Sequence, residues 1–126
     1  MIEAVRLHQI RSWSDGEVTF APGVQIFWGE NGAGKTTILE ACIIAATGRS
    51  HRAGALREVI SGNEERGAIT VNVRDDDGDP ADPLAHSALR VEVAHTGRAR
   101  YLINGTPRSE EHTSELQSRG LISYAV

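Results

Sequence analysis

The chain has 126 residues, of which 40% are apolar and 24% charged, the balance of a soluble globular domain that can bury a core. Its formal net charge of −4 gives no electrostatic indication of a nucleic-acid partner, and no apolar stretch is long enough to cross a bilayer. The N-terminus lacks the layout of a secretory signal and the lone Cys42 excludes an internal disulfide, so we expect a cytoplasmic protein without a membrane partner.

Residues with strand patterns open the chain. Ile2 to His8 predicts a first strand, and a turn is expected at Ser14–Gly16. Glu17 to Phe20 alternates polar and apolar residues, as a second strand does. After a turn at Pro22–Gly23, Val24 to Trp28 is nearly unbroken in its apolar character, which is typical of a strand buried on both faces.

A helix is predicted next. Thr36 to Thr47 is apolar nearly all round, which indicates a central, buried helix, and Gly48 is its expected C-terminal stop. Cys42 is interpreted as a small core residue on this helix. Ser50 to Gly67 is polar and aperiodic, so we expect a loop that carries a short helix around Leu56–Ile60.

The C-terminal half reads as strands and tight turns. Ala68 to Arg74 alternates as a strand, and the acidic connection Asp75–Pro83 lacks the carboxylates that a calcium loop needs. Leu89–Ala94 and Arg98–Ile103 predict a hairpin with a three-residue loop, His95–Gly97.

That loop length fixes the register of the hairpin. It pairs Glu92 with Arg100 on one face, with Gly97 left-handed in the loop. The opposite face then holds Leu89, Val91, Val93, Ala99, Tyr101 and Ile103. Asn104-Gly105 is a further turn, and its match to a glycosylation acceptor is read as turn chemistry only.

The motif that carries chemistry is a phosphate-binding loop of the form G-x-x-x-x-G-K-[ST]. It consists of Gly29, Glu30, Asn31, Gly32, Ala33, Gly34, Lys35 and Thr36. Glycines let the backbone N–H groups wrap a phosphate chain, and the following helix points its N-terminal dipole at the anion. Lys35 is expected to neutralise the β- and γ-phosphates, Thr36 to coordinate Mg²⁺ and Thr37 to bond the α-phosphate. We therefore predict nucleoside triphosphate binding.

Basic residues follow the helix closely: Arg49, His51, Arg52 and Arg57. Local sequence alone favours a solvated basic loop. The functional alternative is contact with phosphate, from either a nucleotide or DNA.

Two sequence blocks together resemble a known family. FWGENGAGKTTILEA, followed by GRSHR at residues 48–52, resembles the RecF family of recombination-repair ATPases, which shares its head with the SMC and ABC ATPases. Ile10-Arg11 after the first strand and Ile103–Gly105 at the end of the hairpin fit the same pattern, so the resemblance covers residues 1 to 107.

The resemblance implies an α/β fold, the N-terminal lobe of an ABC/SMC-type P-loop ATPase head. Its mixed sheet would have an antiparallel portion beside a central helix and a parallel core. The implied cofactors are ATP and Mg²⁺, with Arg11 as a further nucleotide-binding residue. Arg49, His51 and Arg52 would contact phosphate or DNA. The implied partners are DNA at single-strand/double-strand gaps, recombination mediator proteins and, with ATP, a second copy of the chain.

The chain also departs from the family. It contains no ABC signature motif, no Walker B acidic strand and no lid helices, so residues 1–107 read as a truncated head that binds ATP without hydrolysing it. Arg108 to Val126 abandons the strand pattern and resembles the in-frame translation of a sequencing-library adapter. We expect this tail to be non-native and disordered.

Alternative functions remain open. The chain could be an SMC-like head fragment, which would continue into a long heptad coiled coil, or a β-rich fragment with no function of its own. A small-molecule P-loop kinase is disfavoured because two strands precede the loop. An ABC transporter subunit is disfavoured because residues 48–52 have no role in it.

Overall fold

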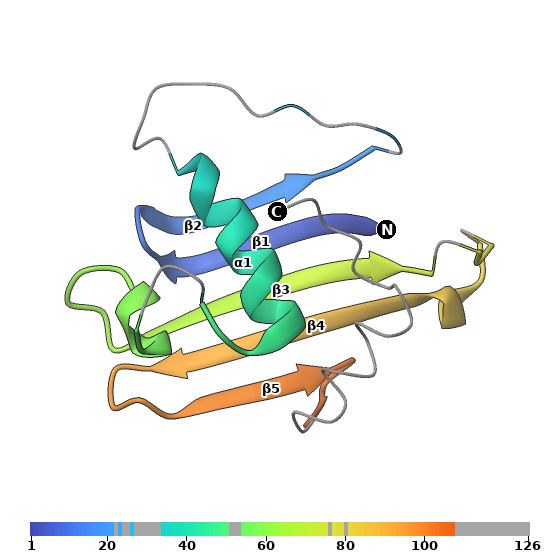
Figure 1. Cartoon of the computed structure of the whole chain (residues 1–126). Coiled ribbons are helices and arrows are strands. Elements are labelled where there is room, and N and C mark those ends of the chain that lie inside the picture. Colours follow the sequence, from blue (N-terminus) through green and yellow to red (C-terminus); the bar gives the residue numbers. More distant parts are fainter. Residues whose placement is uncertain are drawn as a thin grey trace.

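The computed structural model describes residues 1–21, 23, 26, 34–50, 54–75, 77–79 and 81–107. In chain order the elements are β1 (Ile2–Ile10), β2 (Trp13–Thr19), α1 (Lys35–Thr47), η1 (Leu56–Val59), β3 (Arg66–Arg74), η2 (Pro83–Ala85), β4 (His86–Ala94), β5 (Ala99–Ile103) and β6 (Thr106–Pro107). The labels η1 and η2 denote short 3₁₀ helices. Figure 1 shows a single twisted sheet with α1 lying across one of its faces.

The six strands form one sheet in the order β2-β1-β3-β4-β5-β6. Every neighbouring pair is antiparallel. The antiparallel portion expected from the sequence is therefore present. A parallel core is not represented in the strands that the structure describes, and it stays a prediction.

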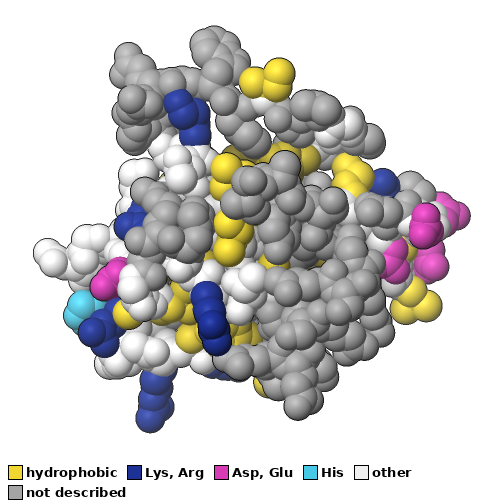
Figure 2. Space-filling view, viewed as in Figure 1, with side chains coloured by type: hydrophobic (Ala, Val, Ile, Leu, Met, Phe, Trp, Pro, Cys, Tyr) yellow, Lys and Arg dark blue, Asp and Glu magenta, His cyan; other side chains and the backbone are white. Residues whose placement is uncertain are grey.

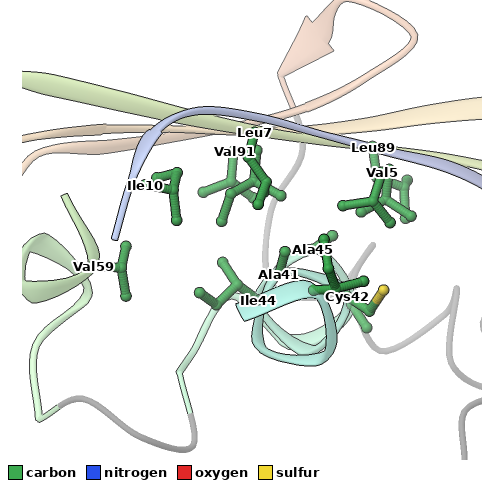
Figure 3. Packing of buried hydrophobic residues seen from close by; sticks show 14 of the residues in the cluster. Val5, Leu7, Ile10, Ala41, Cys42, Ile44, Ala45, Val59, Leu89 and Val91 are labelled. Atoms are coloured by element: carbon green, nitrogen blue, oxygen red, sulfur yellow. The ribbon is translucent and has the colours of Figure 1, made fainter. Parts of the chain in front are cut away.

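Alternation along the strands places the core between the sheet and α1. Ile69 and Val71 of β3 and Leu89 of β4 are fully buried, whereas their sequence neighbours face away from the helix. Figure 3 shows Val5, Leu7, Leu89 and Val91 of the sheet pointing toward Ala41, Cys42, Ile44 and Ala45 of α1. This packing of a half-buried sheet on one apolar helix face supplies the hydrophobic stabilisation of the fold.

The predicted helix is confirmed, one residue longer at its start. Most of its residues are buried, but Leu39 keeps 49% of its surface exposed, so α1 is not covered all round. At its end the N–H of Gly48 donates to the carbonyl of Ile44 at 2.7 Å, which confirms Gly48 as the C-terminal stop.

The hairpin register is confirmed in full. Glu92 lies opposite Arg100, and an Arg100 Nη1 to Glu92 Oε1 ion pair of 3.4 Å joins them. Gly97 has a φ of 98°, and the Asn104-Gly105 turn has φ values of 51° and 84°. The predicted short helix in the loop is also present, as η1. The two-residue strand β6 after the turn was not predicted.

The predicted turn at Ser14–Gly16 is wrong. Asp15 and Gly16 lie inside β2, paired with His8 and Leu7 of β1, and the chain reverses earlier, between the paired residues Ile10 and Trp13. Gly16 is needed for a close approach instead: a Cβ built there would lie 2.5 Å from the Trp13 ring. The glycine therefore marks a packing contact and not a change of chain direction.

The predicted strand Val24–Trp28 lies mostly outside the described residues. Ile26 is described; it belongs to no strand and 80% of its surface is exposed, so the prediction of a buried strand is wrong at this position. The tail predicted for residues 108–126 also lies outside the described residues, and the division of the chain at residue 107 stays a prediction.

Candidate functional site

The end of the phosphate-binding loop forms the start of α1. Gly34 is the N-cap residue, with φ 94° and ψ 9° in the left-handed region, and Lys35 is the first helical residue. A left-handed residue here favours glycine, in agreement with the motif. Gly29, Glu30, Asn31, Gly32 and Ala33 lie outside the described residues, so their predicted phosphate contacts stay predictions.

The first turn of α1 carries the predicted functional side chains. Lys35 is half-buried, Thr36 is exposed and Thr37 is 4% exposed. No acidic residue lies in this turn, and the N-cap Gly34 has no side chain to accept a bond from the first N–H groups. The 13-residue helix therefore presents the positive end of its dipole beside Lys35, an environment that favours an anion.

Trp13 of β2 lies against this helix start. Its indole Nε1 donates to the carbonyl of Gly34 at 3.4 Å, a long hydrogen bond. The same nitrogen would lie 2.5 Å from a Cβ built on Gly34, so the ring and the glycine backbone are in direct contact. The hairpin of β1 and β2 thereby fixes where the phosphate-binding loop ends.

Arg11 occupies the turn between β1 and β2 and binds Glu40 of α1. Its Nε donates to Glu40 Oε1 and its Nη2 to Glu40 Oε2, both at 3.0 Å, which is a bidentate ion pair. The hydrogen bonds that Arg11 donates to Glu40 raise the pKa of the Arg11 guanidinium above its usual value, so it stays charged. The sequence predicted a nucleotide contact for Arg11, and the structure shows a contact with Glu40.

The segment after α1 is tied to the same carboxylate. Ser50 Oγ donates to Glu40 Oε2 at 2.6 Å. Tyr101 of β5 adds a second attachment, since its hydroxyl donates to the carbonyl of Gly48 at 3.2 Å. Arg49 is exposed in this segment, whereas His51 and Arg52 lie outside the described residues.

Sequence reasoning singled out neither Trp13, Glu40 nor Ser50 as a site residue. A signal for Glu40 was available, because it is the only acidic residue in a helix that is otherwise almost wholly apolar. A charge at such a position is retained only with a partner. Ser50 lies within the block at residues 48–52 that carries the family resemblance, but nothing in the sequence gave it a role, and no comparable signal marked Trp13.

The residues present fit a bound nucleotide. A left-handed glycine, a helix N-terminus and a lysine on its first residue are the groups that hold a phosphate chain. No group of three or more His, Cys, Asp or Glu side chains suited to a metal is found among the described residues. The Thr36 hydroxyl, which the motif assigns to Mg²⁺, belongs to an exposed residue on the first turn of α1.

The structure also bears on the acidic connection Asp75–Pro83 and on membrane-spanning helices. Figure 2 shows acidic side chains gathered at the connection between β3 and β4, where Asp75, Asp77 and Asp79 lie, and they form no metal cluster in the part of the chain that is described. Within that same part, no helix combines the length and the apolar character that a membrane span needs.

The chain matches a protein-family model over most of its length. The AAA domain family matches residues 4–120. Among curated proteins, the DNA replication and repair protein RecF of Bifidobacterium longum subsp. infantis is 42% identical over 105 residues, covering 80% of this chain and 25% of that protein. RecF of Lachnoclostridium phytofermentans is 33% identical, covering 63% and 22%. The chain thus spans about a quarter of the length of these relatives.

Solved structures share the fold. A structure from work on ATP-driven dimerisation and DNA-stimulated activation of SMC ATPases has a TM-score of 0.80 and 25% identity, covering 97% of this chain and 80% of that one. A structure of the recombination mediator protein RecF with ATP has a TM-score of 0.75 and 23% identity, covering 86% and 28%. The α/β fold is therefore that of RecF and SMC ATPase heads.

Proposed function

The chain belongs to the AAA domain family and corresponds to the N-terminal part of RecF, and on this premise we propose that it binds ATP–Mg²⁺ at the start of α1. The observation that carries the proposal is the junction of Gly34 and Lys35. A left-handed glycine leads directly into a helix whose first residue is the lysine of the motif. Helix dipole, backbone N–H groups and ammonium then act on one anion.

Each residue of the site has a distinct role. Gly29, Glu30, Asn31, Gly32, Ala33 and Gly34 supply backbone N–H groups to the phosphate chain. Lys35 neutralises the β- and γ-phosphates, the Thr36 hydroxyl is a ligand for Mg²⁺, and Thr37 bonds the α-phosphate. Lys35 and Thr36 are supported by their place on the first turn of α1, where both precede the buried part of the helix.

Arg11 acts at the edge of this site. Its guanidinium is bound to Glu40, and Trp13, two residues along the chain, contacts Gly34. We therefore assign Arg11 to the wall of the site, where its charge is paired with the Glu40 carboxylate and its contribution is to hold the turn that carries Trp13.

Hydrolysis is not proposed for the chain by itself. ATP hydrolysis by P-loop ATPases needs, besides the phosphate-binding loop, groups that hold Mg²⁺ and orient the attacking water. The residues assigned above are given roles in binding the phosphates only.

The wider role follows the RecF relatives. We propose that the whole protein pairs with a second copy in the presence of ATP, binds DNA at single-strand/double-strand gaps and works with recombination mediator proteins in a cytoplasmic repair process. Support comes from relatives named DNA replication and repair protein RecF and from the RecF structure described as part of the RecFOR pathway. Arg49, His51 and Arg52 are the proposed phosphate or DNA contacts, close in sequence to the end of α1.

An SMC-like head is the second candidate. SMC heads match the fold as well as RecF does, with a TM-score of 0.80 against 0.75. The curated relatives favour RecF, because both are named RecF and one of them is 42% identical over 105 residues.

Calorimetric titration of the full chain with Mg²⁺–ATP tests the proposal. We expect one saturable site, and Lys35→Ala should weaken the affinity roughly 10- to 100-fold, because charge-assisted contacts with phosphate are lost. Arg66→Ala is the matched control, since it removes one exposed positive charge at the start of β3 and should leave the affinity unchanged. Equal affinities of the wild type and Lys35→Ala would refute nucleotide binding at this loop.

A further inference from the structure

Glu40 is a buried charge inside an apolar helix. Its side chain has no exposed surface, and its neighbours Leu39 and Ala41 are apolar. Removing a carboxylate from water is costly unless it is fully hydrogen-bonded, so its contacts should explain why it is there.

The contacts of Glu40 join segments that are distant in sequence. Arg11, from the turn between β1 and β2, donates to both carboxylate oxygens at 3.0 Å. Ser50, from the segment that follows α1, donates to Oε2 at 2.6 Å. One carboxylate on the helix therefore holds a turn that precedes α1 and a segment that follows it.

The turn held by Glu40 has a constrained backbone. Arg11 has a φ of 52°, in the left-handed region, where a residue with a side chain is strained. Its N–H donates to the carbonyl of Val59 at 2.8 Å, and its carbonyl accepts from Ser61 Oγ at 2.5 Å. Together with the two bonds to Glu40, these contacts fix both the main chain and the side chain of Arg11.

The turn in turn fixes the end of the phosphate-binding loop. Trp13, two residues after Arg11, contacts Gly34 through its indole nitrogen and ring. A displaced Arg11 would shift Trp13, and a shifted Trp13 would move the N-cap of α1. At its other contact, Ser50 leads directly into His51 and Arg52, the proposed phosphate contacts.

We propose that Glu40 is a positioning residue of the nucleotide site, which aligns the Arg11–Trp13 turn with Gly34 on one side and the Ser50 segment on the other. The inference rests on the proposed function, because the site that it aligns is the ATP–Mg²⁺ site. Glu40 touches neither phosphate nor metal in this role; it acts through Arg11, Trp13 and Ser50.

Fold stability alone does not account for the pair. A well-packed apolar pair of similar volume would stabilise the same contact as well or better than a buried ion pair. The bidentate geometry adds what an apolar contact lacks, a fixed orientation of the guanidinium plane and hence of the turn that carries it.

The test compares Mg²⁺–ATP affinity of the full chain with that of Glu40→Gln, by calorimetry at a temperature at which both are folded. An amide cannot accept charge-assisted bonds from Arg11 and Ser50 as the carboxylate does, so we expect the affinity to fall roughly tenfold or more, as when a supporting contact is removed from a binding site. Glu92→Gln is the matched control, because Glu92 pairs with Arg90 and Arg100 on the other side of the sheet. Its affinity should equal that of the wild type.

A second variant separates alignment from folding. Arg11→Met combined with Glu40→Met replaces the ion pair by apolar side chains of similar length, which a fold generally accepts. We expect this double variant to be folded and still to bind Mg²⁺–ATP roughly tenfold more weakly. Wild-type affinity in a folded double variant would overturn the inference, whether or not Glu40→Gln folds.

A spectroscopic readout keeps the inference distinct from the proposed function. The chain has two tryptophans, so Trp28→Phe leaves Trp13 as the single emitter. In that background we expect Glu40→Gln to shift the emission of Trp13 without added nucleotide, because the ring leaves Gly34. Unchanged emission would overturn the inference even if the wild type bound no ATP, whereas a shift without any ATP binding would leave the alignment standing and refute only the nucleotide site.

Discussion

At the scale of single residues, the proposed site is built from contacts between residues distant in sequence, which neighbouring residues do not predict. Glu40 binds a residue 29 positions earlier and another 10 positions later. Trp13 meets Gly34 across 21 positions. The phosphate-binding motif was predictable because its residues are contiguous and each has a chemical reason. The surrounding shell was not, since the partners of Glu40 depend on how the β1–β2 hairpin lies on α1.

Gly16 illustrates how a residue type misleads at this scale. Its position after Ser14-Asp15 predicted a turn, but the structure uses it to seat Trp13. We expect Gly16→Ala to lower the free energy of unfolding by about 1–3 kcal/mol, because the added methyl group overlaps the ring. Urea denaturation measures it. Gly54→Ala is the control, since no atom lies within 4 Å of its added Cβ; a loss no larger than in this control would refute the contact.

The burial of Cys42 predicts how the free energy of unfolding depends on pH. Burial raises the pKa of its thiol from 9.0 to about 11, so the thiolate forms first in the unfolded chain. The contribution of the protonated thiol to the free energy of unfolding is therefore complete below pH 9 and is lost as the pH rises through 11. The two-unit difference corresponds to about 2–3 kcal/mol. Between pH 8 and 11 we expect the free energy of unfolding to fall more steeply with pH in the wild type than in Cys42→Ala. The same pH dependence in both proteins would contradict the burial of this thiol.

At the scale of elements, periodicity was the reliable guide. Ala68–Arg74 and the hairpin of Leu89–Ala94 with Arg98–Ile103 alternate strictly because one face of the sheet packs on α1 and the other does not. A one-residue shift in register would turn the apolar side chains of a strand away from the core, so the alternation in the sequence is strict. Val24–Trp28 shows the limit of the same reasoning, since an apolar run alone predicted a buried strand and Ile26 is 80% exposed.

The two faces of α1 should differ sharply in their tolerance of substitution. Ile44 has no exposed surface and points at the sheet, whereas Leu39 is 49% exposed (Figure 3 shows Ile44 in this core). We expect Ile44→Ala to cost about 2–5 kcal/mol through lost burial and a cavity. Leu39→Ala on the same helix should cost less than about 1 kcal/mol. Similar losses in denaturant titrations of the two variants would contradict the placement of α1 on the sheet.

At the scale of the whole molecule, the sheet and helix form a platform with the site at one end of the helix. The β1–β2 turn and the segment after α1 both bind Glu40, and Trp13 of β2 contacts Gly34 at the start of α1, so the platform joins the segments of the proposed nucleotide site. The family could be recognised from the sequence because residues 48–52 follow the phosphate-binding motif at the spacing that the family shows. The chain spans about a quarter of the length of these relatives, so the partners of the whole protein stay proposals.

The opposite face of the sheet offers an internal comparison. Arg6, Thr70 and Arg90 are adjacent across β1, β3 and β4 and line a pocket on the side away from the core. Arg6 and Arg90 bring positive charge to this pocket, although Asp15 and Glu17 also line it and Arg90 is paired with Glu92. The proposal therefore distinguishes two locations, because it places ATP at the start of α1 and not at the pocket lined by Arg6 and Arg90.

The most direct measurement is a titration of the ¹⁵N-labelled full chain with Mg²⁺–ATP, followed by amide and indole chemical shifts. Saturable changes should be largest at the amides of Gly34 to Thr37 and at the Trp13 indole N–H, while Arg6, Thr70 and Arg90 stay unchanged. Changes concentrated on those three residues, or no saturable change at Gly34 to Thr37, would contradict ATP binding at the start of α1.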